Sequence, residues 1–333
     1  MFEKLIIFVV ILLQVMFIFS GCSPSGLLIR PVPAEIELTE TQIDRDEGLF
    51  VTDKIAVVDV DGMLVNMRRS AFFSDGENPV SLFLEKLDRA QKDKNVKAMV
   101  LRLNSPGGTV SASDAMYNAL KDFKQESRKP VIACMLDVSA SGAYYIACGC
   151  DGIVAQPTTV TGSIGTIMQT FSFEGTMQKL GIKSEAIKSG DLKDMASPMR
   201  DLGEEERVIL QNIIMRFYER FLEVVIEGRP ELKEERLREL ADGRVFTASQ
   251  ALSEGLIDKI GYPSDAIKWA KKATGVKSAK VVIYHRPMGY KPNVYSTAGG
   301  SFTNFGALIN LELPDWLTSN GTQFLYLWQP AAD

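Results

Sequence analysis

Histidine and cysteine, two side chains that commonly serve in catalysis and metal binding, are scarce in this sequence. The 333 residues include one histidine, His285, and four cysteines. No Cys-x-x-Cys pair, cysteine–histidine cluster or phosphate-binding P-loop is present, so we expect no bound metal, nucleotide or other cofactor. With one histidine in the chain, a reactive serine is expected to take its general base from a lysine or a carboxylate.

The sequence also lacks an excess of positive charge. It has 37 Lys and Arg against 42 Asp and Glu, which gives a formal net charge of −5. No basic stripe that could follow a phosphate backbone is present. Nucleic acid is therefore not expected as a partner, and the charge balance says nothing about the substrate.

The long apolar run of this chain lies at its N-terminus. Residues 5–19 are apolar apart from Gln14, so we expect residues 1–22 to be a signal peptide or a short membrane anchor. The last four of them, FSGC, resemble a bacterial lipobox in which Cys22 is lipidated, although Phe19 stands where leucine is usual. The alternative is an uncleaved anchor in which Cys22 has no role. Both interpretations place the rest of the chain on the outer face of a bacterial cytoplasmic membrane.

The remaining cysteines are Cys134, Cys148 and Cys150. Cys148 and Cys150 are too close in sequence for an easy disulfide bridge. We expect all three to be small side chains of the core.

Beyond residue 22 the sequence divides into three parts. Residues 23–52 are rich in proline and acidic residues and are expected to form a linker, residues 53–286 a single α/β domain, and residues 287–333 a C-terminal tail. The tail contains the apolar run FLYLW (324–328), which could pack on the domain, meet the membrane or occupy a cleft.

Strand-like and helix-like segments alternate through the domain. This order predicts βα units and a mostly parallel core sheet. The expected strands are residues 54–65, 97–103, 130–136, 152–156, 183–188 and 276–284, and the expected helices are residues 78–91, 111–126 and 204–227, with a further helix opened by Ser141. The long helix 204–227 is expected to pack in the core or between subunits.

Ser141, in the small-residue segment DVSASGAYYIA (137–147), is the candidate nucleophile. Gly142 leaves room for a substrate backbone, and a helix N-terminus favours negative charge on a nearby oxygen. A serine at this position is also a favoured helix N-cap, which stays open as the alternative. The segment is not a GxSxG nucleophile elbow because Ser139 replaces the first glycine, and this excludes an α/β-hydrolase.

The motif NSPGGT (104–109) follows an expected strand directly. Its adjacent glycines allow backbone N–H groups to face a cleft without interference from side chains. Such a turn can form half of an oxyanion hole, where fixed donors meet the charge that develops on a carbonyl oxygen. An ordinary Pro-Gly-Gly turn is the alternative.

Lys193 is the candidate general base, because it lies among small residues in KSGDLKDMASP (188–198). A lysine acts as a base only when its pKa falls from about 10.4 to about 7 to 8, which costs roughly 4 kcal/mol. Asp194 would oppose that shift if its carboxylate faced the amine, so we expect it to point away.

Three other polar residues attract attention without a predicted catalytic role. Asp59 and Asp61, in VDVDG, could suggest a carboxylate pair but are expected to be solvated near a turn. His285 is expected to be structural or exposed.

Five motifs in a fixed order together resemble the short form of the bacterial signal peptide peptidase A family. They are NSPGGT, SASGAYYIA, TGSIGTI (161–167), KSGDLKDMASP and GRVFTASQALSEGLIDKIG (243–261). The resemblance runs from about Lys54 to Ile283.

This resemblance implies a membrane-bound serine peptidase with a Ser-Lys dyad and a crotonase-like, Clp-protease-like α/β fold of ββα units. It places the nucleophile on Ser141 and the general base on Lys193. Ser163, in TGSIG, matches the hydroxyl that holds and orients the lysine amine. Gly108 and Gly142 match the backbone donors of the oxyanion hole.

The resemblance also implies an assembly and a substrate. Family members form a ring in which serine and lysine come from different subunits, and this chain has one copy of the motif set, so self-association into a homo-oligomer is expected. The substrates would be remnant signal peptides in the membrane. Two alternatives are a catalytically silent lipoprotein that binds peptides or scaffolds a complex, and a crotonase-like acyl-CoA enzyme.

Overall fold

The computed structural model describes residues 37–48, 50–67, 70–71, 74–75, 77–286 and 323–328. The chain divides into two compact units, Met1–Glu37 and Leu38–Asp333, and the described helices and strands belong to the second. The signal peptide or anchor expected in residues 1–22, with Cys22, lies outside the described residues. Among the helices that are described, none combines the length and the apolar character needed to cross a membrane.

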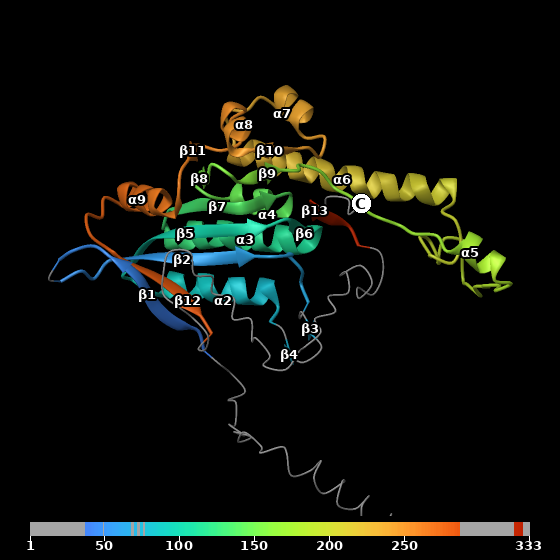
Figure 1. The fold of residues 1–333 in the computed structure, drawn as a ribbon, viewed down its shortest axis with the longest axis horizontal. Helices are drawn as coiled ribbons and strands as arrows, with labels where there is room; N and C mark the ends of the chain where they lie inside the picture. Colours follow the sequence, from blue (N-terminus) through green and yellow to red (C-terminus); the bar gives the residue numbers. More distant parts are fainter. Residues whose placement is uncertain are drawn as a thin grey trace, which may run out of the picture. The chain divides into compact units, whose positions relative to one another are not determined.

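A nine-stranded sheet forms the centre of the second unit (Figure 1). Its main path is β1-β12-β2-β5-β7-β8-β11, and β9 pairs with β7 and β10. Neighbouring strands run parallel except in the pairs β1–β12 and β9–β10. The strands are β1 (Thr39–Arg45), β2 (Lys54–Asp61), β5 (Val96–Ser105), β7 (Val131–Ala140), β8 (Gly152–Ala155), β9 (Val160–Gly162), β10 (Val245–Thr247), β11 (Lys259–Ile260) and β12 (Lys280–His285). The expected α/β class with a mostly parallel sheet is confirmed.

Two short strand pairs lie off this sheet. One joins β3 (Ser70–Ala71) to β4 (Ser74–Asp75), and the other joins β6 (Gly107–Thr109) to β13 (Leu325–Leu327). The second pair links the NSPGGT motif to the C-terminal tail across more than two hundred residues of sequence. The tail strand therefore packs on the domain, alongside the NSPGGT strand.

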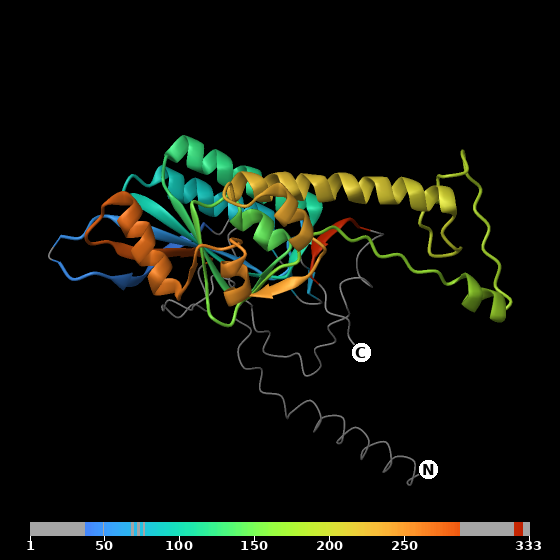
Figure 2. The ribbon, with the colours of Figure 1, turned by 90° about the horizontal axis from the view of Figure 1, so that it is seen from above.

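Helices cover both faces of the sheet because both faces are apolar. Successive side chains of a strand point to opposite sides: in β2, Val58 enters a large core with side chains of α2, α3, α4 and α6, whereas Val57 enters a smaller one with α9. Figure 2 shows α9 on one side of the sheet and α2 and α3 on the other. The helices are α2 (Pro79–Lys92), α3 (Val110–Ser127), α4 (Gly142–Ala147), α5 (Glu174–Lys179), α6 (Glu204–Gly228), α7 (Glu234–Leu240), α8 (Ala248–Ser253) and α9 (Pro263–Thr274).

Local sequence signals explain where these helices begin. Asn78 caps α2 because its side-chain oxygen accepts from the backbone N–H groups of Val80, at 3.0 Å, and Ser81, at 3.3 Å. Thr109 caps α3 in the same way, through the N–H of Ala112 at 3.3 Å. The cap of α3 also ends the glycine strand β6, so the helix fixes one end of the NSPGGT motif.

Two expectations about residues outside the central strands are wrong. Residues 39–45, within the expected linker 23–52, form β1, which pairs with β12 at the edge of the sheet. Residues 183–188 form no strand, and every side chain from 178 to 193 is exposed. An apolar pattern alone cannot make a strand there, because no neighbouring strand supplies hydrogen-bond partners.

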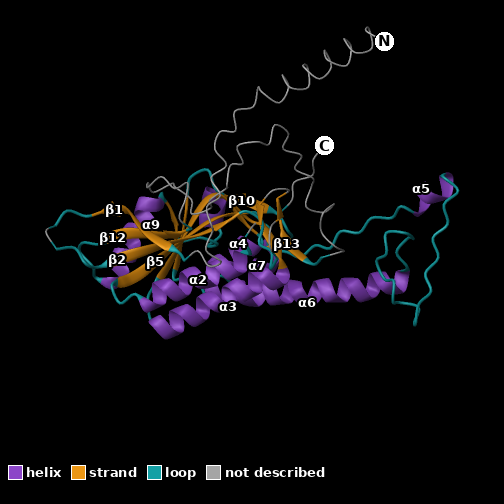
Figure 3. Cartoon of the chain, turned by 90° about the horizontal axis from the view of Figure 1, so that it is seen from below, coloured by secondary structure: helices purple, strands orange, loops and turns teal. Residues whose placement is uncertain are grey.

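The segment between β9 and α6 instead forms an arm, residues 168–203, that extends away from the sheet beside the first half of α6 (Figures 1 and 2). The second half of α6 belongs to the core, where Phe221, Val224 and Val225 are buried. In its first half Val208 is exposed. The long helix is thus a core helix over one half, and its other half extends past the sheet towards the arm (Figure 3). That half carries the exposed apolar side chains Val208 and Met215.

Candidate active site

Ser141 stands at the junction of β7 and α4, near the carboxyl end of the central sheet. It is 1% exposed. Its N–H donates to the Gly162 carbonyl at 2.7 Å, and its own carbonyl accepts from the Tyr145 N–H at 2.9 Å. These bonds hold the backbone at φ +53° and ψ −115°, a region that non-glycine residues seldom occupy and that costs about 1–3 kcal/mol.

The Ser141 hydroxyl has no hydrogen-bond partner among the described residues. The side chain makes no cap bond to α4, so the N-cap alternative is wrong. A buried hydroxyl without a partner is unfavourable unless another group meets it, as a substrate or a second chain would. The strained backbone and the unpartnered oxygen keep Ser141 as the candidate nucleophile.

The glycine strand β6 is held beside Ser141 by Leu64, which follows the end of β2. The Leu64 N–H donates to Gly107 at 2.9 Å, and the Leu64 carbonyl accepts from Thr109 at 2.8 Å. A Cβ on Gly108 would lie 2.0 Å from that carbonyl oxygen, a distance that no side chain tolerates. Gly108 is therefore required by the close approach of the Leu64 backbone.

The geometry of β6 also determines which way the Gly108 N–H faces. The Gly107 carbonyl and the Thr109 N–H, which bond to Leu64, lie on one edge of the strand. The N–H and carbonyl groups of Gly108 therefore lie on the other edge. On that edge the register pairs Gly108 with Tyr326 of β13. The Tyr326 carbonyl oxygen lies 3.2 Å from the position of a Cβ on Gly142. A peptide carbonyl therefore lies beside both glycines expected to form the oxyanion hole.

β13 lies between the strand β6 and the backbone of Ile167, as a bound peptide would. One edge pairs with β6, and on the other edge Leu325 exchanges backbone hydrogen bonds with Ile167 at 2.9 and 3.0 Å. The Tyr326 ring is buried against Tyr145 and Phe221, with centroids 5.2 and 4.8 Å away, and its hydroxyl donates to the Phe217 carbonyl at 2.6 Å. Tyr145 and Phe221 thus form an aromatic pocket beside the glycine strand, and the Tyr326 ring fills it.

Ser163 lies next to Ser141 because β9 pairs with the end of β7. The register sets Gly162 opposite Ala140, and the Ser163 N–H donates to the Arg244 carbonyl at 2.8 Å. Ser163 is 7% exposed and has a φ of +50°. Four of the five expected site residues are thereby brought together: Ser141, Gly142, Gly108 and Ser163.

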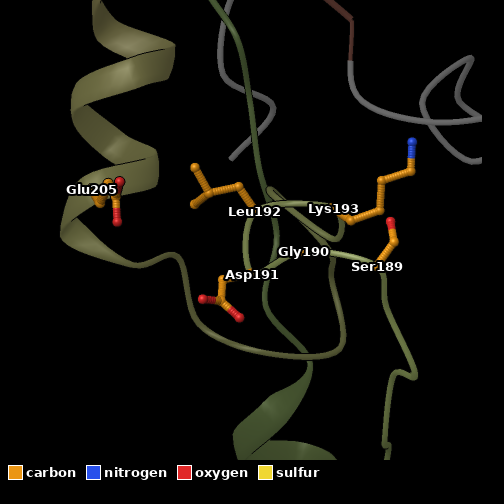
Figure 4. Close-up of a pocket in the computed structure, with 6 residues that line it drawn as sticks. All are labelled: Ser189, Gly190, Asp191, Leu192, Lys193 and Glu205. Atoms are coloured by element: carbon orange, nitrogen blue, oxygen red, sulfur yellow. The ribbon is translucent and has the colours of Figure 1, made fainter.

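Lys193 is the exception, because it lies on the arm. Its N–H donates to the Gly190 carbonyl at 3.1 Å, and its exposed side chain has no hydrogen bond or ion pair within the described part of the chain. Figure 4 shows Lys193 and Ser189 on one side of a surface hollow, pointing away from Asp191 and Glu205. In Figures 1 and 2 the arm lies at the end of α6 that is farther from α4. Within one chain, Lys193 does not meet Ser141.

Asp59 is buried and Asp61 is partly buried, contrary to the expectation that both are solvated. Asp59 is buried, and Arg102 donates to its carboxylate at 2.6 Å. Burial, followed by the negative charge of Asp59, raises the pKa of Asp61 to about 6. Burial likewise lowers the pKa of Lys86. The sequence alone did not reveal this ion pair, because Arg102 belongs to another strand, and only the register of β2 with β5 sets it opposite Asp59.

The other residues singled out from the sequence are structural. His285 is buried in β12, and its Nε2 lies 2.8 Å from the Thr41 hydroxyl of β1. Cys134 and Cys148 are free thiols in the core, as expected, and burial raises their pKa to about 12. Cys150 is partly buried against the same core. Among the described residues no group of three or more His, Cys, Asp or Glu could hold a metal ion.

Two features of the site escaped the sequence analysis. Leu64 acts through its backbone, which leaves no side-chain signal, and Arg200 organises the turn that carries Lys193. The arginine could have been suspected, because Arg200 lies two residues after the KSGDLKDMASP motif and precedes the acidic start of α6.

Known proteins resemble this chain over most of its length. The model of peptidase family S49 matches residues 123–277. A protein of Enterococcus faecium, provisionally named signal peptide peptidase SppA, is 37% identical over 74% of this chain and 71% of its own length. A provisionally named protease of Synechocystis sp. is 35% identical over 83% of this chain and 96% of its own length, and one of Methanocaldococcus jannaschii is 32% identical over 78% and 83%. The chain therefore belongs to peptidase family S49, whose members are serine peptidases with a Ser-Lys pair.

Proposed function

We propose that this protein is a membrane-associated serine endopeptidase that degrades remnant signal peptides and other apolar peptides after preproteins have been processed. Membership of family S49 supports peptide hydrolysis. One observation carries the choice of nucleophile: the Ser141 hydroxyl is buried, unpartnered among the described residues and set on strained backbone next to Gly142.

The residues take the following roles. A neutral Lys193 amine removes the proton of Ser141 Oγ as that oxygen attacks a peptide carbonyl, and the N–H groups of Gly108 and Gly142 hold the oxyanion. The Lys193 ammonium then protonates the leaving amine as the C–N bond breaks. Lys193 next deprotonates a water that releases the acyl group and restores Ser141. The Ser163 hydroxyl orients the amine.

Lys193 acts on Ser141 of a neighbouring subunit in a ring-shaped homo-oligomer. This arrangement is supported by the position of Lys193 on the arm, apart from α4, and by the apolar side chains that the arm exposes. These are Phe171, Phe173, Leu180, Ile182, Ile187 and Met199. A group of exposed apolar side chains on one segment is typical of a protein interface.

Substrates bind as an extended strand beside β6. The support is β13, an extended segment whose Tyr326 carbonyl lies at the two glycines and whose Tyr326 ring fills an aromatic pocket. Backbone pairing supplies affinity without sequence preference, and the pocket favours an apolar residue at one position. Remnant signal peptides, which are rich in apolar residues, suit both requirements.

The enzyme acts at the bacterial cytoplasmic membrane, with the catalytic domain on the extracytoplasmic side. Residues 1–22 hold it there as an anchor, or lipid on Cys22 does. The apolar run and the FSGC sequence support this location.

The first test measures hydrolysis of a fluorogenic apolar peptide by the full chain in detergent, across pH, for the wild type, Ser141→Ala and Lys193→Ala. We expect each substitution to lower kcat by about 10³-fold or more, because the two residues act as a unit. Equal activity in all three proteins would show that Ser141 and Lys193 do not form a catalytic dyad. A wild type that binds the peptide without cleaving it would favour the silent lipoprotein, and hydrolysis of an acyl-CoA thioester in its place would favour the crotonase-like enzyme.

The second test asks whether the two residues come from different subunits. Ser141→Ala and Lys193→Ala chains are unfolded together, refolded as a mixture and assayed. Sites that join an intact serine to an intact lysine should recover part of the wild-type activity. Complete inactivity of a mixture shown to co-assemble would place the dyad within one chain.

A further inference from the structure

Lys193 is followed directly by a carboxylate, Asp194, which could hold its amine as an ammonium ion. Asp194 is instead bound by two other cations. Its Oδ1 accepts from Lys188 Nζ at 2.6 Å and from Arg200 Nη2 at 2.7 Å, and its Oδ2 accepts from Arg200 Nε at 3.1 Å. Both carboxylate oxygens are thus engaged by the forked arginine side chain, a strong and directional pairing.

Arg200 is in turn fixed to the start of α6. Its guanidinium donates to both oxygens of Glu206, at 3.0 Å for the Nη1–Oε2 pair, and to the Asp194 carbonyl at 3.3 Å. Glu206 has a side chain that is 5% exposed and also accepts from the Gly203 N–H at 3.0 Å. Arg200 therefore ties the turn that carries Lys193 to the first turn of a long helix.

The charges of this cluster cancel, and Lys193 is left out of it. Two cations, Lys188 and Arg200, face two anions, Asp194 and Glu206. Hydrogen bonds from Arg200 and then Lys188 hold the pKa of Asp194 well below its usual range. The other acidic groups at the Lys193 hollow are Asp191 and Glu205, and Figure 4 shows the Lys193 side chain directed away from both.

We propose that Arg200 is a positioning residue that holds the Asp194 carboxylate against α6, so that Asp194 cannot pair with Lys193 and the lysine amine stays free to act as the base. This inference rests on the proposed role of Lys193. Without Arg200, Asp194 keeps a single cationic partner and gains freedom to approach the amine one residue away. A carboxylate partner stabilises the ammonium form and raises the pKa of the base.

The test is the pH profile of kcat/KM for the full chain in detergent, with the fluorogenic apolar peptide. Arg200→Ala should move the acid limb to higher pH by about one unit or more, since an opposite charge at close range shifts a pKa by about 1–3 units. Activity near neutral pH should fall about tenfold. Adding Asp194→Asn, which removes the charge and keeps the shape, should return the limb to the wild-type position. Arg200→Lys, which keeps a cation but loses the fork, should shift the limb by less.

Arg236→Ala is the matched control, because Arg236 also makes a forked pair, to Glu254 at 2.8 and 3.0 Å, elsewhere on the surface. The Arg236→Ala substitution should leave the acid limb of the pH profile where it is in the wild type. Equal loss of activity in Arg200→Ala and the double variant, with no shift of the limb, would overturn the inference and leave a merely structural role.

A second measurement covers the case in which Arg200→Ala does not assemble. An amine-reactive reagent acetylates Lys193, and mass spectrometry follows the rate of this reaction as a function of pH. The midpoint of that profile reports the pKa of Lys193. It is measured in Ser141→Ala chains with and without the Arg200→Lys substitution. An unshifted midpoint there would overturn the inference. Full activity of Lys193→Ala would instead overturn the proposed function, which separates the two failures.

Discussion

At the scale of single residues, this site stores conformational strain in its backbone. Ser141 and Ser163 both have positive φ, at +53° and +50°. Neither is a glycine, and both are held by backbone hydrogen bonds at the edges of β7, β9 and β10. The surrounding sheet thus compensates for conformations that a short peptide of the same sequence would avoid.

Ser141→Gly should separate strain from catalysis. Glycine adopts positive φ without a Cβ penalty, so the free energy of unfolding should rise by about 1 kcal/mol while peptidase activity is lost. Ser141→Ala removes the same hydroxyl but keeps the strain, and should not gain this stability. Chemical denaturation of both variants checks the difference, and equal stability would show that the backbone at Ser141 is unstrained.

Asp61 should make the stability depend on pH. Its folded pKa, about 6, lies above the ordinary value of 3.8, so the folded state binds a proton more tightly than the unfolded chain. Stability therefore falls as pH rises between those two values and stays low above about pH 6. Asp61→Asn should stabilise the protein by about 1 kcal/mol more near pH 8 than near pH 5. The same gain at both pH values would contradict the raised pKa.

At the scale of elements, the C-terminal strand β13 and the helix α6 build the pocket beside the glycine strand. Tyr326 is buried against Phe221 of α6 and Tyr145 of α4. The same α6 continues past the sheet and carries, at its first turn, the acidic group that holds Arg200. One helix therefore connects the pocket of its own chain to the turn that bears Lys193.

Removing residues 323–333 should free the slot beside β6. If substrates take the place of β13, the truncated enzyme should show a KM for apolar peptides several-fold lower, because the open site no longer competes with the chain's own strand. Its melting temperature should fall, since the buried Tyr326 ring is lost. Tyr326→Ala should reproduce part of both effects. An unchanged KM with a lowered melting temperature would assign β13 a purely structural part.

At the scale of the whole molecule, one chain does not assemble the proposed site. Ser141, Gly108, Gly142 and Ser163 lie together, whereas Lys193 lies on an arm whose apolar side chains are exposed. A second copy of the chain would supply the missing base and cover the arm at the same time. Activity should therefore depend on assembly, and dilution below the assembly range should abolish it.

Ile182→Glu, on the exposed arm, tests this dependence. Because the side chain is exposed within one chain, the stability of the isolated fold should change by less than about 0.5 kcal/mol. Assembly and peptidase activity should be lost together. Leu84→Glu, at an exposed apolar position on α2, is the control and should retain both. Analytical ultracentrifugation measures the assembly of both variants, and the peptidase assay measures their activity. An active monomer would refute a site shared between subunits.

The sequence by itself determined the alternation of strands and helices, the positions of α2 and α3, and the motifs that contain Ser141, Gly108 and Ser163. These features are local: hydrophobic period, capping side chains and glycine turns act within a few residues. The tertiary structure decided the rest, because it depends on pairing between distant segments. It placed residues 39–45 in the sheet, left residues 183–188 without a strand partner and buried Asp59 against Arg102. It also set Tyr326 beside Gly108 and Gly142, and paired Asp194 with Arg200 and not with the lysine beside it.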